Sequence, residues 1–323
     1  MGFNRDNFVR IRAEYEKKHL IAENAADERR REIWEKYPEI EEIDRKLSET
    51  GLDIFRAAID GQPLGDVRKQ NEALVAERGR LLCAAGYPED YTDPKYDCPL
   101  CRDSGYVGYR MCACMRRRLI EAGYESSGIA GLMKAQSFEN FNLDYYKAVP
   151  GAYDIMKYNL GILQEYAEHF SVGTSDDKPS QSLTLVGGTG LGKTHLSTAV
   201  AKAVIDRGFD VVYVSAIDLF SEFDDDRFRA KQTGTDISRY FACDLLILDD
   251  LGTEVTTKLT VSNLYRLINE RVSRLLPTII STNLDHNKQK DVYGDRIASR
   301  LFGEFRPLIF AGKDVRMLKI GER

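Results

Sequence analysis

Residues 187–194 read Gly187-Gly188-Thr189-Gly190-Leu191-Gly192-Lys193-Thr194, and they fit the pattern G-x-x-x-x-G-K-[ST]. An apolar run, Leu183–Val186, precedes them, and a stretch typical of a helix follows. Glycines let successive backbone N–H groups turn toward an anion, and the start of the following helix adds partial positive charge. The stretch therefore predicts a strand, a phosphate-binding loop and a helix. A glycine-rich turn with an incidental lysine is the alternative, and the flanking strand and helix disfavour it.

The polar residues of this loop have separate expected roles. We expect Lys193 to meet the β- and γ-phosphate oxygens of a nucleoside triphosphate, and Thr194 to ligate Mg²⁺. The backbone of residues 187–192 would surround the phosphates. The whole stretch from Gly187 to Thr194 is thus a predicted ATP-binding site.

Downstream of residue 180 the sequence alternates between short apolar runs and helical stretches. This alternation is typical of an α/β domain with a wound parallel sheet, whose strands are continuously apolar because helices cover both faces. The expected strands are Leu183–Val186, Asp210–Ser215, Leu245–Leu248, Thr278–Ser281 and a last one near Leu308–Phe310. The expected helices are Lys193–Asp206, Ala216–Phe223 and Leu259–Leu275.

Two neighbouring carboxylates, Asp249 and Asp250, end the apolar run Leu245–Leu248. The carboxyl end of a buried strand is the edge where α/β sheets bind ligands. Because successive side chains of a strand point to opposite sides, we expect Asp249 to hold the Mg²⁺ shell and Asp250 to orient or polarise the attacking water. The alternative is a strand that simply enters an acidic turn. The acidic pair lies about sixty residues after a phosphate loop, and this spacing disfavours the alternative.

Three further polar residues are candidates for the reaction. Asn283 follows the run Thr278–Ser281, where its amide can hydrogen-bond the γ-phosphate or the lytic water; an Asx turn is the alternative. Arg296 and Arg300 are four residues apart on one predicted helix face. At a subunit boundary, Arg300 could reach a neighbour's γ-phosphate as an arginine finger, and a surface salt bridge is the alternative.

The chain before residue 87 is rich in Glu, Arg, Lys, Leu and Ala, with breaks near Pro38, Gly51 and Gly61–Pro63. Apolar residues at three- and four-residue steps, with Thr50 among them, and at a seven-residue spacing in the next helix predict short antiparallel helices or a short coiled coil. These residues are Ile40, Ile43, Leu47, Ile54, Leu74 and Leu81. We expect residues 1–90 to form a helical partner-binding region, and a plain helical bundle is the alternative.

Four cysteines form two closely spaced pairs that are separated by ten residues. They are Cys98, Cys101, Cys112 and Cys114. Two thiol pairs across a short hairpin can converge on one tetrahedral ion, and Zn²⁺ suits four thiolates. Residues 91–120 are too short to bury a core, so zinc would supply most of the folding energy of this module. An iron–sulfur cluster is the alternative, whereas a redox dithiol needs only one pair. We expect Cys83 and Cys243 to be buried small hydrophobes.

The composition of the 323 residues, 43% hydrophobic and 30% charged, is that of a globular protein. No apolar run approaches the ~20 residues of a membrane span, and the first twenty residues are not signal-like, so we expect a cytoplasmic protein without a membrane partner. Six cysteines in such a chain favour metal binding or free thiols over disulfides. The net charge of -5 gives no global attraction to nucleic acid. DNA contacts would depend on local patches such as Arg116–Arg118. A solvated helix face is the alternative for these three arginines.

Four segments together resemble the AAA+ ATPases of the bacterial DnaC/DnaI helicase-loader type. They are GGTGLGKT, LLILDDLG, the TIISTNL strand and the DRIASRLF helix. The resemblance runs from about Phe138 to Arg316, and Ser137–Phe141 looks like the family's lead-in to the adenine pocket. Residues 86–114 are similar to the cysteine-bearing N-terminal region of Gram-positive and phage-like members. Residues 121–323 are therefore expected to form an AAA+ ATPase domain, after a helical region and a zinc module.

This resemblance implies roles for individual residues. Those roles are Walker A for Lys193 and Thr194, Walker B for Asp249 and Asp250, sensor 1 for Asn283, and a finger acting in trans for Arg300 with Arg296 as its companion. Most AAA+ proteins have Asp-Glu in Walker B, so the shorter second carboxylate implies slow ATP turnover. No separate helical lid is recognisable after Phe302, which leaves a sensor 2 role for Arg316 open.

The resemblance also implies a function. A factor of this type contacts a hexameric DnaB-type replicative helicase through its helical N-terminal region, while its ATPase domain self-associates and holds single-stranded DNA. ATP binding would favour the assembled state, and hydrolysis, stimulated by oligomerisation or DNA, would release the loader. The nearest alternative is an IstB-like ATPase helper of DNA transposition. A DNA-binding regulator with a vestigial ATPase is another, and the intact Walker residues speak against it.

Overall fold

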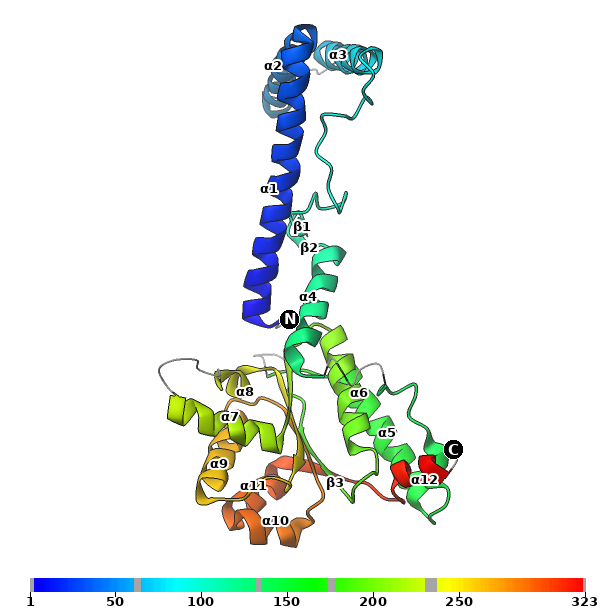
Figure 1. The fold of residues 1–323 in the computed structure, drawn as a ribbon, viewed down its shortest axis with the longest axis vertical. Coiled ribbons are helices and arrows are strands. Elements are labelled where there is room, and N and C mark those ends of the chain that lie inside the picture. The colour runs from blue at the N-terminus through cyan, green and yellow to red at the C-terminus, as the bar shows by residue number, and fades with distance from the viewer. Residues whose placement is uncertain are drawn as a thin grey trace. The chain divides into compact units, whose positions relative to one another are not determined.

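The computed structural model describes residues 3–60, 65–129, 131, 135–173, 178–229 and 237–321 (Figure 1). Contacts between residues divide the chain into two compact units. The larger unit contains Met1–Val9 and Arg116–Arg323, and the smaller unit contains Arg10–Met115. The described helices include none that is long and apolar enough to cross a membrane.

The larger unit is built on a five-stranded parallel sheet with the strand order β4-β5-β6-β3-β7. The strands are β3 (Ser182–Val186), β4 (Val211–Ser215), β5 (Leu245–Leu251), β6 (Thr278–Thr282) and β7 (Phe305–Ile309). The predicted wound parallel sheet is thus confirmed. The last strand begins at Phe305 rather than near Leu308, because β7 is an edge strand and therefore tolerates Pro307, which interrupts its apolar pattern.

Helices cover both faces of this sheet. On one face, α5 (Ala152–Glu168) and α6 (Lys193–Asp206) contribute to a buried cluster that includes Ile279. On the other face, α7 (Ala216–Arg229) and α9 (Lys258–Ser273) contribute to a second cluster that includes the next residue, Ile280. Successive residues of the central strands therefore enter different cores, which explains why these strands are continuously apolar.

Several elements of the larger unit lie outside the predicted alternation. They are η1 (Leu143–Tyr146), α5, α8 (Ser238–Ala242), α10 (His286–Tyr293), α11 (Asp295–Glu304) and α12 (Val315–Gly321). Helix α11 is the helix expected from the DRIASRLF segment. Helix α10 is short, and the Asp285 side chain caps it by accepting a 2.9 Å hydrogen bond from the Lys288 backbone N–H.

Three helices form most of the smaller unit, in agreement with the predicted helical character of this region. They are α1 (Arg5–Lys36), α2 (Pro38–Asp60) and α3 (Gly65–Ala84). Pro38 is the first residue of α2, where its fixed φ suits a helix start. The predicted break near Gly51 is wrong, because α2 continues through this glycine. The predicted break at 61–63 lies outside the described residues.

Helices α2 and α3 pack against each other along the predicted apolar positions. Ile40 and Ile43 are buried, and Thr50 is 7% exposed. The Thr50 hydroxyl donates within its own helix and accepts a 2.8 Å hydrogen bond from the Asn71 amide of α3. A polar pair inside this contact fixes how the two helices align along each other.

The cysteine-bearing segment contains a two-stranded antiparallel hairpin of β1 (Tyr106–Val107) and β2 (Arg110–Met111). Helix α4 (Ala113–Ser127) follows directly. It carries Arg116–Arg118, of which Arg118 pairs with Glu121 and Glu125, whereas Arg116 and Arg117 are exposed.

Candidate nucleotide-binding and metal sites

The predicted phosphate loop connects β3 to α6, as the sequence indicates. Gly190 and Gly192 have φ values of 70° and 90°, in the left-handed region that favours glycine. A Cβ on Gly192 would lie 2.8 Å from the Tyr146 hydroxyl oxygen and 2.9 Å from a ring carbon of Phe141. Any other residue at position 192 would therefore force both aromatic side chains to move.

Lys193 is buried beneath its own loop. Its Nζ donates hydrogen bonds of 2.8 and 2.7 Å to the backbone oxygens of Gly187 and Gly188. Burial lowers the pKa of Lys193, and the nearby carboxylates of Asp250 and Asp249 oppose that shift. An ammonium group is thus present at the loop and directed at its backbone.

Asp249 lies at the centre of a network of hydroxyl groups. Its Oδ2 accepts hydrogen bonds from Thr194 Oγ1 at 2.9 Å and from the Tyr213 hydroxyl at 2.5 Å. Its Oδ1 accepts a hydrogen bond from Ser281 Oγ. The structure therefore brings together Thr194 and Asp249, the two predicted Mg²⁺ ligands. Tyr213 on β4 and Ser281 on β6 were not predicted.

Asp250 has a strained backbone, with φ at 56°. The pairing of β5 with β6 shifts register between Leu248 and Leu251, so Asp250 falls within the irregularity. Its backbone N–H donates a 2.8 Å hydrogen bond to Ser281 Oγ. Burial and the neighbouring Asp249 carboxylate raise the pKa of Asp250. Ser281 thus contacts both adjacent acidic residues.

Replacing Ser281 with alanine is expected to lower ATP turnover about tenfold, because two hydrogen bonds that position the acids are lost. The Mg²⁺ concentration needed for half-maximal turnover should rise, whereas ATP binding without Mg²⁺ should stay the same. Steady-state kinetics over a Mg²⁺ titration measure both effects.

Two variants serve as controls for this prediction. Ser281→Thr keeps the hydroxyl and should restore most of the activity. Thr184→Val removes a buried hydroxyl of β3 that has no partner among the described residues, and it should leave the Mg²⁺ requirement unchanged. An unchanged Mg²⁺ requirement in Ser281→Ala would show that this serine does not position the acids.

A cavity of about 200 Å³ opens beside the phosphate loop. Residues of the loop and α6, together with others from separate segments, line it. The lining residues are Gln136, Thr189, Gly190, Leu191, Gly192, Lys193, Thr194, His195, Asp250, Val315 and Arg316. Arg316 therefore faces the cavity and is positively charged beside Lys193, whose pKa it helps to lower. Sequence reasoning left the position of Arg316 open.

Asn283 and Arg300 are not among the residues that line this cavity. Asn283 is exposed at the end of β6, and its Oδ1 lies 3.4 Å from where a Cβ on Gly252 would stand. Arg300 lies on α11, and its guanidinium is 5.9 Å from the centre of the Tyr265 ring. Arg296, on the same helix, is exposed. A finger acting in trans is expected to lie away from the cavity of its own chain.

The segment before α5 is fastened to the phosphate loop. The His195 ring nitrogen Nε2 lies 2.8 Å from the backbone oxygen of Ser137, and the His195 ring meets Phe141 edge-on at 5.1 Å. The Tyr146 hydroxyl donates a 3.0 Å hydrogen bond to the backbone oxygen of Leu191. These contacts hold residues 137–146 next to the loop, and the adenine pocket implied for Ser137–Phe141 stays a prediction.

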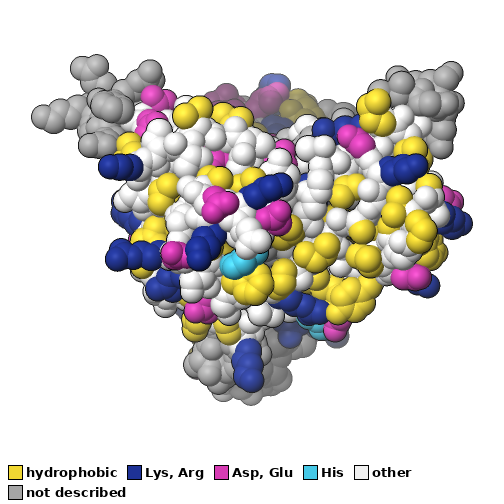
Figure 2. All heavy atoms as spheres, turned by 90° about the horizontal axis from the view of Figure 1, so that it is seen from below, with side chains coloured by type: hydrophobic (Ala, Val, Ile, Leu, Met, Phe, Trp, Pro, Cys, Tyr) yellow, Lys and Arg dark blue, Asp and Glu magenta, His cyan; other side chains and the backbone are white. Residues whose placement is uncertain are grey.

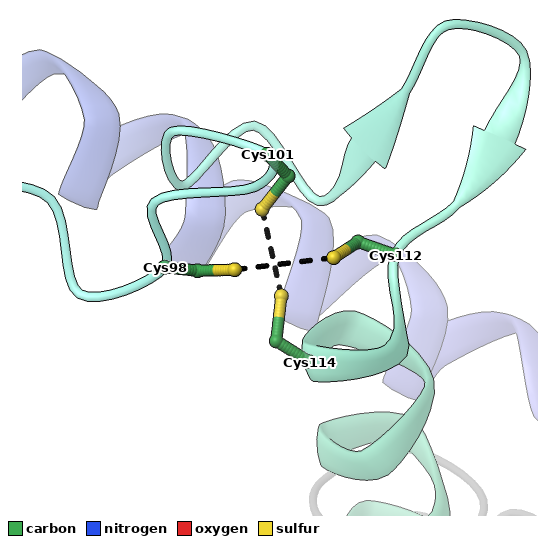
Figure 3. A group of neighbouring side chains, drawn as sticks. All are labelled: Cys98, Cys101, Cys112 and Cys114. Carbon is green, nitrogen blue, oxygen red and sulfur yellow. Dashed lines mark hydrogen bonds between the residues drawn. The ribbon is translucent and has the colours of Figure 1, made fainter.

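The four paired cysteines converge in the smaller unit (Figure 3). Their sulfur atoms all lie within 4.8 Å of one another. Cys98 Sγ is 3.9 Å from Cys112 Sγ, and Cys101 Sγ is 3.5 Å from Cys114 Sγ. Sulfur atoms at about 2.3 Å from a tetrahedral zinc are about 3.8 Å apart, so the donor set fits that ion.

Hydrogen bonds fix the backbone and the side chains around these cysteines. The Asp103 carboxylate accepts 2.8 Å hydrogen bonds from the backbone N–H groups of Asp97 and Cys98. Hydrogen bonds from backbone N–H groups, chiefly that of Cys101, lower the pKa of Cys98 to about 7. Tyr15 of α1 hydrogen-bonds Cys114. Such contacts orient metal-binding thiolates.

The two remaining cysteines differ from each other. Cys243 is buried, as predicted, and lies 3.4 Å from a guanidinium nitrogen of Arg271. The prediction for Cys83 is wrong, because its side chain is exposed. The neighbouring Leu82 is the residue of this helical turn that enters the core, which directs Cys83 toward solvent.

A family model and several known proteins match the sequence of this chain. A family model described as IstB-like ATP binding protein matches residues 174–302. The chain is 26% identical over 224 residues to the phage-like element PBSX protein XkdC of Bacillus subtilis, which covers 64% of this chain and 79% of that protein. It is 24% identical over 188 residues to the replicative helicase loader DnaC of Escherichia coli K12, which covers 58% of this chain and 71% of that protein.

Among solved structures, the chain is similar to a crystal structure of the DnaC helicase loader, with a TM-score of 0.44 and 23% identity. That similarity covers 54% of this chain and 98% of the other. The phosphate loop, the acidic end of β5 and the sequence matches agree with the resemblance stated above. The chain contains a phosphate loop, its residues 174–302 match the IstB-like ATP binding protein family, and its sequence is similar to those of DnaC-type replicative helicase loaders.

Proposed function

We propose that this chain is a cytoplasmic, ATP-dependent loader of a hexameric replicative helicase, in which ATP binding and hydrolysis switch assembly and release. One observation carries the ATP-dependent part. Thr194 and Asp249 are separated by 55 positions in sequence, yet Thr194 Oγ1 donates a 2.9 Å hydrogen bond to Asp249 Oδ2. Thr194 lines the same cavity as Lys193. This is the arrangement of hydroxyl, carboxylate and ammonium that Mg²⁺ and a triphosphate require.

The residues of the site divide the work of hydrolysis among them. Backbone N–H groups of residues 187–192 and the Lys193 ammonium would bind the phosphates, and Thr194 and Asp249 would hold Mg²⁺. When bound, Mg²⁺ neutralises charge on the β- and γ-phosphate oxygens. Asp250, with its raised pKa and strained backbone, would orient the attacking water. Asn283 would contact the γ-phosphate or that water.

We further propose that Arg300 completes the site of a neighbouring copy. Replacing Arg300 with alanine is then expected to lower ATP turnover on the order of 100-fold, because an arginine finger stabilises charge in the transition state. ATP binding by the variant should be unchanged. Arg274→Ala, which removes a surface arginine paired with Glu270, serves as the matched control and should turn over ATP normally.

Mixing variants tests whether Arg300 acts in trans. Lys193→Ala keeps the finger and loses the phosphate site, whereas Arg300→Ala does the reverse. A mixture of the two should regain part of the wild-type turnover, since one of its interfaces combines an intact site with an intact finger. Turnover no greater than that of the separate variants would contradict an action in trans.

The helical region of the smaller unit is the proposed helicase-binding region. On α2, the side chains of Leu52, Phe55 and Ile59 are 56%, 64% and 69% exposed and lie at three- and four-residue steps. These three residues form one apolar face of the helix, which suits a protein partner. The names of the DnaC relatives indicate the kind of partner, a replicative helicase.

Replacing Phe55 with aspartate is expected to abolish retention of a DnaB-type helicase by the full-length chain, because a charge is placed on this apolar face. Co-purification with the tagged chain measures retention. Ile217→Asp is the matched control, since Ile217 is 55% exposed on α7 of the larger unit. Retention of a transposase instead of a helicase would favour the IstB-like alternative.

We propose that the cysteine cluster holds one Zn²⁺. The sulfur distances and the four-thiolate donor set support zinc.

We propose that single-stranded DNA binds to the larger unit. On the face seen in Figure 2, basic and acidic side chains are interspersed with hydrophobic ones, so that face offers no uniform positive field. DNA binding is therefore expected to require assembly of several copies and to weaken with salt.

A further inference from the structure

The hairpin of β1 and β2 carries exposed side chains that the proposed loader function does not use. Gly108 and Tyr109 form its two-residue turn, and Gly108 has a φ of 58°, in the region that favours glycine. The Cys112 backbone N–H donates a 2.8 Å hydrogen bond to the Gly105 oxygen and closes the base of the hairpin. Figure 3 shows the turn pointing away from the four cysteines. The cysteine segment thus holds the base of the hairpin and presents its turn to solvent.

An aromatic ring stands uncovered at this turn. Tyr109 is 105% exposed, so the described residues leave both faces of its ring open to solvent. Val107, which is 52% exposed, pairs with Arg110 across the hairpin, and paired residues place their side chains on the same face. An aromatic ring, an apolar side chain and a guanidinium group are therefore neighbours at the tip of the hairpin.

The segment of the chain that contains this hairpin is basic, although the whole chain has a net charge of -5. The acidic residue of the segment 98–117 is Asp103, which is 3% exposed and accepts hydrogen bonds from two backbone N–H groups. Several arginines of the same segment are exposed, namely Arg102, Arg110, Arg116 and Arg117. A segment that exposes arginines and buries its carboxylate attracts anions, and a polyanion most of all.

We propose that the turn of this hairpin binds single-stranded nucleic acid, with a base stacked on Tyr109 and a neighbouring phosphate paired with Arg110. A single strand alternates aromatic bases with phosphates, and exposed aromatic rings beside basic groups bind it without regard to sequence. In a duplex the bases are already stacked on one another, so their faces are closed to Tyr109. This site is separate from the DNA contact proposed for the larger unit, and it requires neither ATP nor assembly of several copies.

The test measures the affinity of the full-length chain for a fluorescein-labelled oligodeoxythymidine by anisotropy, without nucleotide. Tyr109→Ala should weaken binding about tenfold, as expected when one stacked base is lost, whereas Tyr109→Phe keeps the ring and should bind as the wild type. Arg110→Ala should also weaken binding and lower the slope of log affinity against log salt by about 0.7, the value for one phosphate contact. Arg68→Ala removes an exposed arginine of α3 that pairs with Glu72, and it should change neither quantity.

Photocrosslinking gives a direct readout of the stacked base. An oligodeoxythymidine that carries one 5-iodouracil should crosslink to the peptide that contains Tyr109, and mass spectrometry identifies that peptide. The metal content of Tyr109→Ala should equal that of the wild type, because the ring lies outside the cysteine cluster.

Three results would overturn the hairpin site. They are unchanged DNA affinity in both Tyr109→Ala and Arg110→Ala, equal affinity of the wild type for a duplex of the same length, and loss of helicase retention in Tyr109→Ala with DNA affinity intact. The last result would assign the turn to a protein partner. Each of them leaves the proposed loader function standing, because the DNA contact of the larger unit is measured separately, with ATP and Mg²⁺ present.

Discussion

Replacing Lys193 with alanine is expected to abolish ATP turnover and to weaken ATP binding about 100-fold, as for loss of a buried charge-assisted contact. Lys193 is the ammonium group of the phosphate loop, and its Nζ already lies within 2.8 Å of two backbone oxygens of that loop. Alanine at this position leaves the phosphates without their positive partner. Calorimetric titration with ATP and Mg²⁺ measures the affinity, and phosphate release measures the turnover.

The matched control is Lys202→Ala on the same helix. Lys202 forms an exposed ion pair with Asp206, so its loss should change neither affinity nor turnover. Thermal unfolding of both variants would establish that they are folded. Turnover by Lys193→Ala at the wild-type rate would contradict the assignment of the loop as the catalytic nucleotide site.

Replacing Cys98 and Cys101 with serine is expected to remove the zinc, of which the wild type should hold about one ion per chain. The smaller unit should then lose helix content around the cysteines, because binding of zinc to four thiolates contributes on the order of 10 kcal/mol to folding. Metal analysis and far-ultraviolet circular dichroism measure the two effects.

A control within the same unit is available. Cys83→Ser changes an exposed thiol outside the cluster and should retain the zinc. ATP binding by the larger unit should persist in all these variants, which would separate metal loss from general unfolding. Stoichiometric iron with visible absorbance would contradict zinc and indicate an iron–sulfur cluster instead.

The parts of the site that follow from local sequence could be predicted well. Helix α6 begins at Lys193 and ends at Asp206, as expected, because the glycines of the loop and Gly208 limit it on both sides. The four cysteines converge because their two pairs flank a short hairpin. These features depend on residues that are neighbours along the chain.

The parts that depend on register and on distant segments could not be predicted. Tyr213 and Ser281 looked like polar interruptions of apolar strands, and only the order β4-β5-β6 brings their hydroxyls to Asp249. Gln136 precedes the phosphate loop in the sequence and Arg316 follows it, yet both residues line the cavity. Their positions follow from how the segment before η1 and helix α12 pack, which no spacing rule encodes.

The hydrogen bonds of Lys193 have a thermodynamic consequence for any incoming ligand. This ammonium donates two of its three N–H groups to the backbone oxygens of Gly187 and Gly188. A phosphate that engages more than the third N–H group therefore replaces existing partners, and the gain from those contacts is the difference between two sets of hydrogen bonds. Discrimination among anions then arises from how many loop amides a ligand engages at once, and a small ion such as sulfate would compete poorly with a triphosphate chain.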